Sequence, residues 1–291
     1  MRVYEATVTA RGAGAKLEKY VSQAFPLLPA RVIRDAFAAR DVKMDGRRAG
    51  RDEPVSEGAR VQLYTGFALP LPVVYEDDRV LLLNKPAGIT CDDDPWGGMT
   101  VLSWIKAHAA GAYEPRLCHR LDNATCGLLL LCKDDEAEAP LLDMFRNRRL
   151  TKIYQCLVRG EMRPPAAVKE AFLVKDAARA QVRVVTHQTP GALPIATQYE
   201  TLAFDGTVSR LRVTLLTGRT HQIRAHMSFL AHPLLGDDKY GDRALNRRLK
   251  VSGLQLCATE LTLRPGGALS YLDGRTFSIQ PPFAAFPNPI G

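Results

Sequence analysis

The strongest constraint on the fold is an abrupt change from polar to apolar residues near the middle of the chain. Residues 118–123 form a charged, hydrogen-bonding cluster that contains Asp122, and the chain then passes through Gly127 into the apolar run 128–132. Such a run predicts a strand buried on both faces of a sheet. A carboxylate beside a buried strand costs free energy unless it has a cationic partner or a chemical function. Asp122 is therefore the first candidate for a functional residue.

The composition is that of an ordinary globular protein with an excess of positive charge. The 291 residues are 46% hydrophobic and 24% charged, and this length gives room for one large domain and a small one. Lys and Arg together number 39 against 31 Asp and Glu, so the formal net charge is +8. Cationic surfaces gain affinity for polyanions by releasing counterions from phosphates. The charge alone is weak support for a nucleic-acid partner, because many basic proteins bind no nucleic acid.

The same sequence argues against several other classes of protein. No apolar stretch approaches the roughly 18 residues that a membrane-spanning helix needs, and residues 1–14 lack the apolar segment of a signal peptide. The six cysteines are scattered without Cys-x-x-Cys spacing, which predicts reduced, partly buried thiols. We therefore expect a cytoplasmic protein that has no membrane partner, no disulfide framework and no zinc site.

Residues 15–64 have the pattern of a small independent unit. Apolar residues recur at helical spacing from Leu17 to Phe25 and again from Val32 to Phe37, and alternation at residues 61–64 predicts a closing strand. Two short helices with a small sheet resemble an S4-type RNA-binding domain. This resemblance implies that basic residues at its edge contact RNA, the alternative being an ordinary solvated face. The arginines at this edge are Arg31, Arg34, Arg40, Arg47, Arg48 and Arg51, of which we select Arg31, Arg34, Arg47 and Arg48.

A short proline-containing segment separates this unit from the rest of the chain. Pro70 and Pro72 stiffen residues 67–72 and exclude regular strand pairing, so we predict a linker there between domains at 1–66 and 73–291. In the larger domain, apolar patterns predict strands at 80–84, 153–158 and 211–215 and helices at 101–110 and 222–231. Residues 160–200 give mixed signals. We therefore predict an α+β protein.

Several motifs of the larger domain occur in an order that resembles a known family. Residues 119–122, His-Arg-Leu-Asp, resemble the central motif of the large-subunit ribosomal type of RNA pseudouridine synthase, the RluA-like family. Segments 78–88, 152–154, 216–226 and 232–241 resemble other motifs of that family in the expected order. The resemblance implies a catalytic domain built on a mixed, largely antiparallel sheet, preceded by the small α/β RNA-binding domain.

The resemblance also implies roles for five residues of the larger domain. Asp122 occupies the position of the catalytic aspartate, Tyr154 that of an active-site tyrosine, and Arg224 that of the arginine that pairs with the aspartate. Arg120 is placed to enter the space left by a flipped-out nucleotide, and Lys85 is expected to contact RNA. The implied reaction isomerises uridine to pseudouridine without a cofactor or a metal. The implied partner is structured RNA, ribosomal RNA more than transfer RNA, and a monomer is favoured.

Departures from the family pattern and simpler interpretations leave alternatives open. Cys126 stands where serine is usual, and residues 90–92 replace a Val-His-Pro-like continuation. By pattern alone, Tyr154 would be a core residue and Arg224 a solvated one. One alternative is a non-catalytic RNA- or ribosome-binding protein that retains the fold, although Asp122 is present. The other is a metal-dependent hydrolase, although the spacing of its candidate ligands favours structural hydrogen bonding. Those candidates are His119, His221, His226 and His232.

Overall fold

The computed structural model describes residues 1–176 and 181–283 and divides into two compact units. The first comprises Met1–Asn123 with Leu130–Asp135, and the second comprises Ala124–Leu129 with Glu136–Gly291. Each unit buries its own set of apolar side chains. The domain boundaries predicted at residues 66 and 73 divide the chain differently and stay a prediction.

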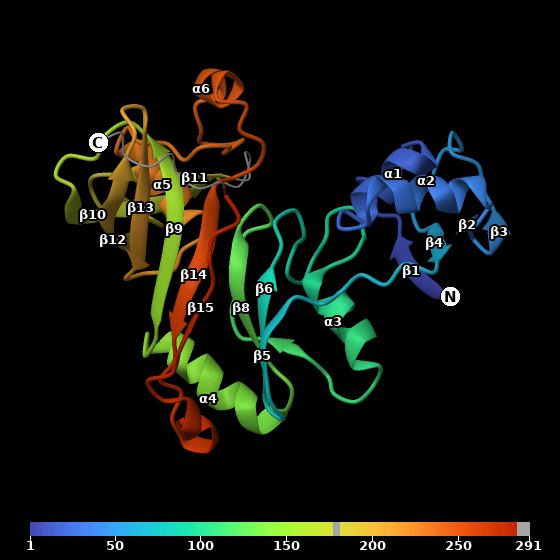
Figure 1. Cartoon of the computed structure of the whole chain (residues 1–291), viewed down its shortest axis with the longest axis horizontal. Helices are drawn as coiled ribbons and strands as arrows, with labels where there is room; N and C mark the ends of the chain where they lie inside the picture. Colours follow the sequence, from blue (N-terminus) through green and yellow to red (C-terminus); the bar gives the residue numbers. More distant parts are fainter. Residues whose placement is uncertain (177–180, 284–291) are drawn as a thin grey trace. The chain divides into compact units, whose positions relative to one another are not determined.

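The first unit begins with a four-stranded antiparallel sheet and two helices (Figure 1). The strands are β1 (Arg2–Thr7), β4 (Arg60–Thr65), β2 (Val42–Met44) and β3 (Arg47–Arg48), in that spatial order. Helices α1 (Leu17–Ala24) and α2 (Ala30–Ala38) bury the apolar positions that predicted them. Both helices are therefore confirmed, whereas β1 is a strand that the sequence analysis missed.

The rest of the first unit provides a hairpin and a helix that precede Asp122 in the chain. Strands β5 (Val73–Glu76) and β6 (Val80–Lys85) pair antiparallel, and the short β7 (Arg116–Leu117) comes later. Helix α3 (Val101–Ala109) begins at a capping box formed by Thr100 and Ser103. This arrangement satisfies two otherwise unpaired N–H groups and fixes the start of the helix. The predicted strand and helix are both confirmed here.

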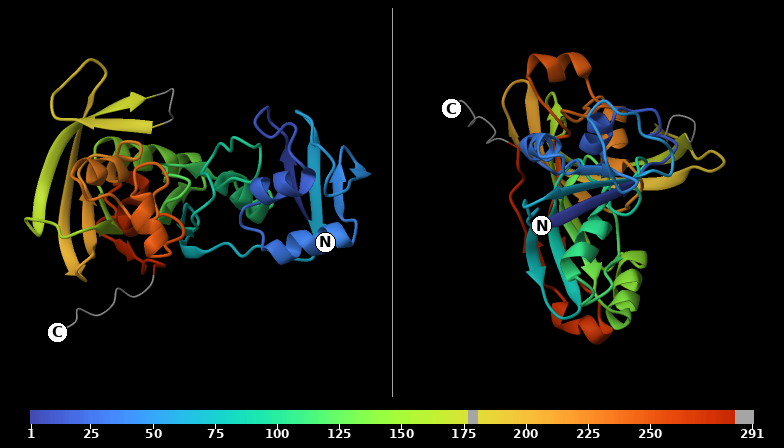
Figure 2. Two further views of the ribbon diagram at one scale, coloured as in Figure 1. Left: turned by 90° about the horizontal axis from the view of Figure 1, so that it is seen from above. Right: turned by 90° about the vertical axis from the view of Figure 1, so that its right-hand side faces the viewer.

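The second unit is built on long strands that lie side by side (Figures 1 and 2). They are β9 (Thr151–Arg159), β10 (Ala166–Asp176), β11 (Gln181–Val185), β12 (Leu193–Phe204), β13 (Val208–Leu215), β14 (Leu256–Thr262) and β15 (Thr276–Ser278). The larger sheet has the order β11-β10-β12-β13-β9-β14-β8-β6-β5, with β15 on β14 and β7 on β8. The run from β11 to β14 is antiparallel, whereas β14 pairs parallel with β8 (Cys126–Cys132). The predicted α+β class with a mixed, largely antiparallel sheet is confirmed.

Helices α4 (Asp135–Arg146), α5 (Gln222–Phe229) and α6 (Arg243–Arg248) and a 3₁₀ helix, η1 (Gly267–Leu272), complete the fold. Helix α5 packs on the sheet through Ala225, which joins a core of buried residues from β10, β11 and β12. That core consists of Ala171, Leu173, Val182, Val184 and Ile195. The packing fixes the orientation of α5 and therefore the direction of its polar side chains.

Strand β8 is buried on both faces, as the apolar run after Gly127 predicted. All seven of its residues are buried. Gly127 has a φ of 113°, and a Cβ atom there would lie 2.3 Å from the carbonyl oxygen of Ala258 on β14. Only glycine tolerates both this conformation and this approach of backbone. Gly127 therefore permits β8 and β14 to pair.

Replacing Gly127 with alanine should destabilise the protein by more than the positive φ alone explains. The left-handed conformation costs an L-residue about 1–2 kcal/mol, and the new Cβ also collides with the backbone of Ala258. Gly111→Ala is the matched control, because Gly111 has a φ of 86° and open space where its Cβ would lie. In urea unfolding, Gly127→Ala should lose at least about 2 kcal/mol more than the control. Equal losses would contradict the steric explanation.

Candidate active site

Asp122 is half-buried in the loop between β7 and β8, and hydrogen bonds hold both its neighbours in the chain. Nε2 of His119 accepts a hydrogen bond from the backbone N–H of Leu130 at 3.0 Å. The thiol of Cys91 accepts from the N–H of Leu121 and donates to its carbonyl, both at 3.4 Å. These contacts give the loop a defined backbone path on both sides of Asp122.

Lys85 is the buried anchor of the same loop. Its side chain is fully buried, and Nζ donates to the carbonyls of Pro86, Ile89 and Asn123 at 2.8, 2.9 and 3.2 Å. The N–H of Gly88 also donates to the carbonyl of Asn123 at 2.9 Å. A buried ammonium needs such acceptors to offset its desolvation. The RNA contact predicted for Lys85 is wrong, because a fully buried ammonium cannot reach a phosphate.

Arg120, two residues before Asp122, extends into solvent. Its side chain is 69% exposed, and Nη1 lies 3.3 Å from Oδ2 of Asp92. An exposed ion pair of this kind contributes little to stability, because water and salt screen it. The guanidinium is therefore held only loosely and is available to move. Asp92 belongs to the segment that departs from the family pattern, so this pair is a feature of this chain.

Arg224 of α5 forms a buried, bidentate ion pair that the sequence analysis did not predict. Nε and Nη2 donate to the two carboxylate oxygens of Asp237 at 2.7 and 2.8 Å, and Nη2 also donates to Asp238 at 3.0 Å. The side chains of Arg224 and Asp237 are 4% and 0% exposed. Two parallel N–H···O bonds fix the plane of a guanidinium as well as its position. Arg224 is therefore a rigid, buried cation and not a solvated one.

The electrostatic surroundings of Asp237 keep it ionised. Burial alone would raise the pKa of Asp237, but the hydrogen bonds and charge of Arg224, with the N–H groups of Tyr240 and Lys239, lower the pKa below its usual value. Those N–H groups donate to Oδ1 at 3.0 and 2.9 Å. The ring of Tyr240 also lies 5.4 Å from the guanidinium carbon of Arg224. The loop after α5 is therefore organised around Arg224.

Tyr154 lies in the middle of β9 and is 7% exposed. It stands opposite Val213 of β13 on one side and Ala258 of β14 on the other. Strand pairing on both sides fixes the backbone of Tyr154. A fixed backbone limits the orientations that the aromatic ring can adopt. Tyr154 and Arg224 lie in the second unit and Asp122 in the first, and the grouping of the three at one site stays a prediction.

A polar network on the inner side of α5 fixes Gln222 and His226. The side chain of Gln222 accepts from Thr217 Oγ1 and donates to Thr197 Oγ1, at 2.8 and 3.0 Å. Nδ1 of His226 lies 3.0 Å from Thr197 Oγ1, and the side chain is fully buried. Burial, and to a lesser degree Lys169, lowers the pKa of His226 to about 4. His226 is thus a neutral structural histidine, as the spacing of the histidines predicted.

Lys152 is a further cation that the sequence analysis did not single out. It precedes Tyr154 by two residues on β9, so both side chains project from the same face of the strand. A Cβ atom on Gly218 would lie 2.8 Å from Nζ of Lys152, so the ammonium lies beside this glycine. Burial, together with Arg148, lowers the pKa of Lys152. The Lys-x-Tyr spacing in a predicted strand was the signal that could have revealed it.

The basic edge predicted in the N-terminal part is present, but its members differ in their neighbours. Arg31, Arg34 and Arg48 are exposed, and no side-chain hydrogen bond or ion pair is found for them among the described residues. Arg47 instead forms an ion pair with Glu53. A paired cation must give up its carboxylate partner before it can neutralise a phosphate. The first three are therefore the stronger candidates for RNA contacts.

Residues 94–99, the docking loop, pack against the N-terminal sheet and helices. Thr7 N–H donates to the carbonyl of Gly97 at 3.2 Å, and Met99 N–H donates to that of Ala24 at 2.7 Å. The hydroxyl of Tyr20 donates to the carbonyl of Trp96 at 3.0 Å. Burial, with the charge of Asp94 in this loop, raises the pKa of Tyr20 to about 12, so the hydroxyl stays protonated at physiological pH.

The docking loop approaches so closely that two glycines are required. A Cβ at Gly97 would lie 1.8 Å from the carbonyl oxygen of Thr7, and one at Gly98 would lie 2.4 Å from that of Ala24. Because real Cβ atoms do not approach backbone this closely, any other residue would force the loop away. The loop continues directly into residues 85–93, which contact the Asp122 loop through Lys85, Cys91 and Asp92.

Two properties of the described residues concern the membrane and metal classes considered from the sequence. No described helix is long and apolar enough to cross a membrane. Within the same residues, no group of three or more His, Cys, Asp or Glu side chains is arranged to hold a metal ion. The expectation that the protein needs no metal stays a prediction.

Comparison with known proteins agrees with the motifs and the fold. A family model described as RNA pseudouridylate synthase matches residues 79–229, which is just over half of the chain. This chain belongs to the RNA pseudouridine synthase family. It is 28% identical over 266 residues to "Ribosomal large subunit pseudouridine synthase C" of Escherichia coli (strain K12), covering 86% of this chain and 83% of that protein. It is 32% identical over 246 residues to "Ribosomal large subunit pseudouridine synthase D" of Haemophilus influenzae, covering 79% and 74%.

Solved structures of human pseudouridine synthases have the same fold. "Human RNA Pseudouridylate Synthase Domain Containing 4" aligns with a TM-score of 0.59 at 23% identity, covering 72% of this chain and 88% of that one. "Human RNA Pseudouridylate Synthase Domain Containing 1" aligns with a TM-score of 0.57 at 25% identity, covering 76% and 94%. The predicted family and its isomerase activity are thus confirmed.

Neighbouring arginines on β3 should differ in their effect on RNA binding. Arg48→Gln removes an unpaired cation, so the slope of log affinity against log salt should become shallower by a little under one unit. Arg47→Gln removes a cation already paired with Glu53 and should change the slope less. Fluorescence anisotropy with a labelled RNA hairpin at increasing KCl measures both. Equal slopes for wild type and Arg48→Gln would remove Arg48 from the interface.

Mild acid should destabilise the protein through His226. The folded pKa of about 4 lies below the ordinary value of 6.5, so between these pH values the unfolded chain binds a proton that the folded chain excludes. Stability is therefore lost as pH falls through this window, by at most about 3 kcal/mol. The pKa of Asp237 is lowered from 3.8, so protonation of Asp237 reduces the stability of the protein only at pH values below this window.

Urea unfolding at pH 6.5 and 4.5 measures the contribution of His226. His226→Gln should reduce the loss of stability between these two conditions. His187→Gln is the control, because His187 is exposed. An unchanged loss in His226→Gln would contradict the assignment.

Proposed function

We propose that this enzyme converts specific uridines of ribosomal RNA to pseudouridine, with Asp122 as the catalytic residue. The observation that carries the proposal is the match of residues 79–229 to the RNA pseudouridylate synthase model. That region contains the His-Arg-Leu-Asp motif that ends at Asp122. The ribosomal target is supported by the names of the E. coli and H. influenzae relatives, both of which are called ribosomal large subunit pseudouridine synthases. Ribosomal RNA is processed in the cytoplasm of bacteria, which is where we place this activity.

The reaction needs one carboxylate and no external reagent. The N1–C1′ bond of uridine breaks, the uracil turns, and a C5–C1′ bond forms; C5 then loses a proton and N1 gains one. A carboxylate at C1′ either attacks that carbon or balances the positive charge that develops there. Both routes require an ionised acid. Because the base that leaves also returns, a single aspartate suffices where a glycosidase needs two carboxyl groups.

In this proposal, Arg224 pairs with the catalytic carboxylate of Asp122. An opposite charge offsets part of the cost of taking a carboxylate out of water. Arg224 is suited to the task because the bidentate pair with Asp237 fixes its guanidinium plane. Tyr154 offers an aromatic face for stacking on the uracil and a hydroxyl that can take part in proton removal. Its position in the middle of the paired strand β9 supports that role.

We assign Arg120 the task of replacing the flipped nucleotide in the RNA stack. Extruding a base costs a few kcal/mol, and a side chain that fills the gap offsets part of this cost. The large exposure of Arg120 and its loose pair with Asp92 support this role, because the guanidinium can leave its partner when RNA arrives. Arg31, Arg34 and Arg48, in the N-terminal part of the protein, would bind other phosphates of the RNA backbone.

A non-catalytic RNA-binding protein with the same fold is the second candidate. The two candidates differ only in whether a bound uridine is isomerised, because both would bind RNA through the same basic residues. The presence of Asp122 in the motif favours the enzyme. A metal-dependent hydrolase has less support, because the described residues offer no cluster of metal ligands.

Asp122→Asn should abolish pseudouridine formation while leaving folding and RNA affinity intact. The amide has nearly the shape of the carboxylate, but it neither attacks C1′ nor balances charge there. Release of tritium from total RNA labelled with [5-³H]uridine, taken from cells that lack this protein, measures the reaction. We expect a loss of at least about 1000-fold, equivalent to about 4 kcal/mol of barrier.

The control is Asp134→Asn, in the segment that follows β8, which should keep full activity. Asp134 is partly exposed and lies 3.7 Å from Arg79. Activity of Asp122→Asn within about tenfold of wild type, a barrier change of only about 1.4 kcal/mol, would reject the catalytic assignment.

A further inference from the structure

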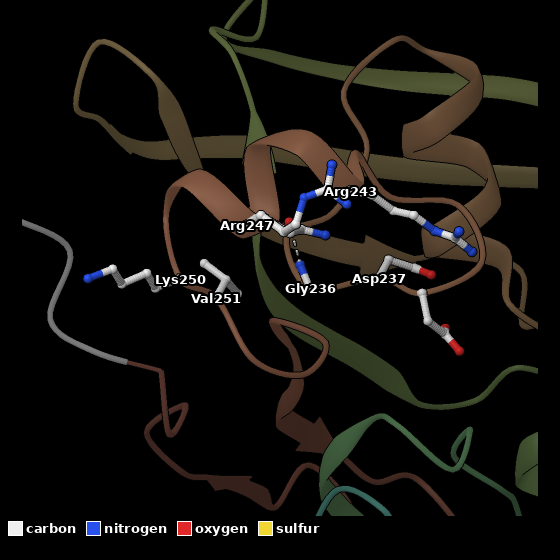
Figure 3. Close-up of a pocket in the computed structure, with 8 residues that line it drawn as sticks. Gly236, Asp237, Arg243, Arg247, Lys250 and Val251 are labelled. Atoms are coloured by element: carbon white, nitrogen blue, oxygen red, sulfur yellow. Dashed lines mark hydrogen bonds between the residues drawn. The ribbon is translucent and has the colours of Figure 1, made fainter.

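Helix α6, the loop before it and the residues after it line an open pocket with a basic wall, along which Arg243 and Lys250 extend in opposite directions (Figure 3). The pocket has a volume of about 310 Å³. Arg243 and Arg247 come from α6, and Lys250 follows its end. On the opposite side lie Gly236 and Asp237, in the loop that holds Arg224. None of these three cations was predicted to have a function.

The three cations of this pocket have no side-chain partner among the described residues, unlike the arginines that form ion pairs elsewhere in the chain. All three are exposed, and their side chains form no hydrogen bond or ion pair with described residues. The carboxylate nearest in sequence, Asp242, is already engaged: it caps α6 through the N–H groups of Ala244 and Leu245 and pairs with Arg159 at 3.0 Å. The positive charge on this wall is therefore not neutralised by the protein.

The pocket also contains two carboxylates, which must be counted against its cations. Asp237 and Asp238 both bond Arg224, at 2.7 and 3.0 Å. Their charge is thus shared with a buried cation, and Asp237 has its oxygens occupied by Arg224 and by the N–H groups of Lys239 and Tyr240. Together with Arg224 the pocket carries an excess of positive charge, which fits an anion and not a metal ion.

Arg243 and Arg247 project from a helix whose position is fixed by contacts with the rest of the second unit. The N–H of Gly236 donates to Oδ1 of Asn246 at 2.9 Å, which ties the middle of the helix to the opposite wall. Leu245, on the inner side, packs into a buried cluster with Val208 and Leu235. Side chains on a fixed helix lose less freedom on binding a ligand than side chains on a loose loop.

We propose that this pocket binds backbone phosphates of the RNA substrate through Arg243, Arg247 and Lys250. The proposal rests on the proposed function, which supplies the polyanion. Asp237, which lines the pocket opposite these cations, also forms the ion pair that fixes Arg224. The bound phosphates would therefore lie close to the arginine that we assign to the active site. Phosphate contacts of this kind position an RNA without reading its sequence.

The test compares two triple variants that have the same net charge. One replaces Arg243, Arg247 and Lys250 with glutamine, and the control replaces Arg163, Lys175 and Arg183, which are exposed cations on other parts of the second unit. Binding is measured by anisotropy with a labelled 30-nucleotide polyuridylate from low to high KCl. Three lost contacts to a single strand should make the salt slope shallower by about two and lower affinity at 100 mM salt at least about tenfold. The control should stay near wild type.

The tritium-release assay separates this proposal from the function itself. In the pocket variant, KM for total RNA should rise at least about tenfold while kcat at saturating RNA stays near wild type, because bound substrate still meets Asp122. A wild-type slope and KM in the pocket variant, or an equal change in the control, would overturn the pocket proposal and leave the function standing. A fall in kcat with unchanged KM would also overturn it. If wild-type protein itself released no tritium, the proposed function would be contradicted, whatever the pocket variant does.

Discussion

The three hydrogen bonds of the buried Lys85 ammonium hold together the loop on which the proposed chemistry depends. They join the turn after β6 to the carbonyl of Asn123, 38 residues further along the chain and next to Asp122. Without the ammonium, the carbonyls of Pro86 and Ile89 would lose this donor, and that of Asn123 would keep only the N–H of Gly88. A buried carbonyl left without a donor costs about 1–3 kcal/mol. The position of the half-buried Asp122 thus depends on a cation that never meets the substrate.

Sequence patterns predicted the elements whose stability is local and failed where partners are distant. The helices around Val21 and Ile33 follow from periodicity, and the buried strand after Gly127 follows from an unbroken apolar run. Strands β10 and β12 gave no clear pattern, although their burial alternates in the structure. The reason is that β12 buries the polar Thr197 and exposes the apolar Leu193 and Leu202, so polarity does not follow burial along it. At the site, motifs indicated Arg224, but its partner Asp237 is brought near only by the turn after α5. Burial of Lys85 likewise depends on contacts that no local pattern contains.

The formal charge of +8 does not by itself say where an RNA would bind. Many arginines are neutralised by nearby carboxylates, as Arg60 is by Glu5 and Arg212 by Glu260. Among the described residues, the exposed cations for which no side-chain partner is found include Arg31, Arg34 and Arg48 and the three cations of the pocket beside α6. Pairing, and not the count of basic residues, therefore distinguishes surfaces that can neutralise phosphate from surfaces that are merely charged.

The glycines of the docking loop restrict how this protein can be recombined with its relatives. Gly97 and Gly98 are fitted to the backbone of Thr7 and Ala24, so the shape of one segment is matched to the surface of another that lies far away in the chain. A chimera that receives a foreign N-terminal fold but keeps residues 94–99 would pair two surfaces that were never matched. A chimera designed to keep this contact should therefore exchange both segments together, although they are far apart in the sequence.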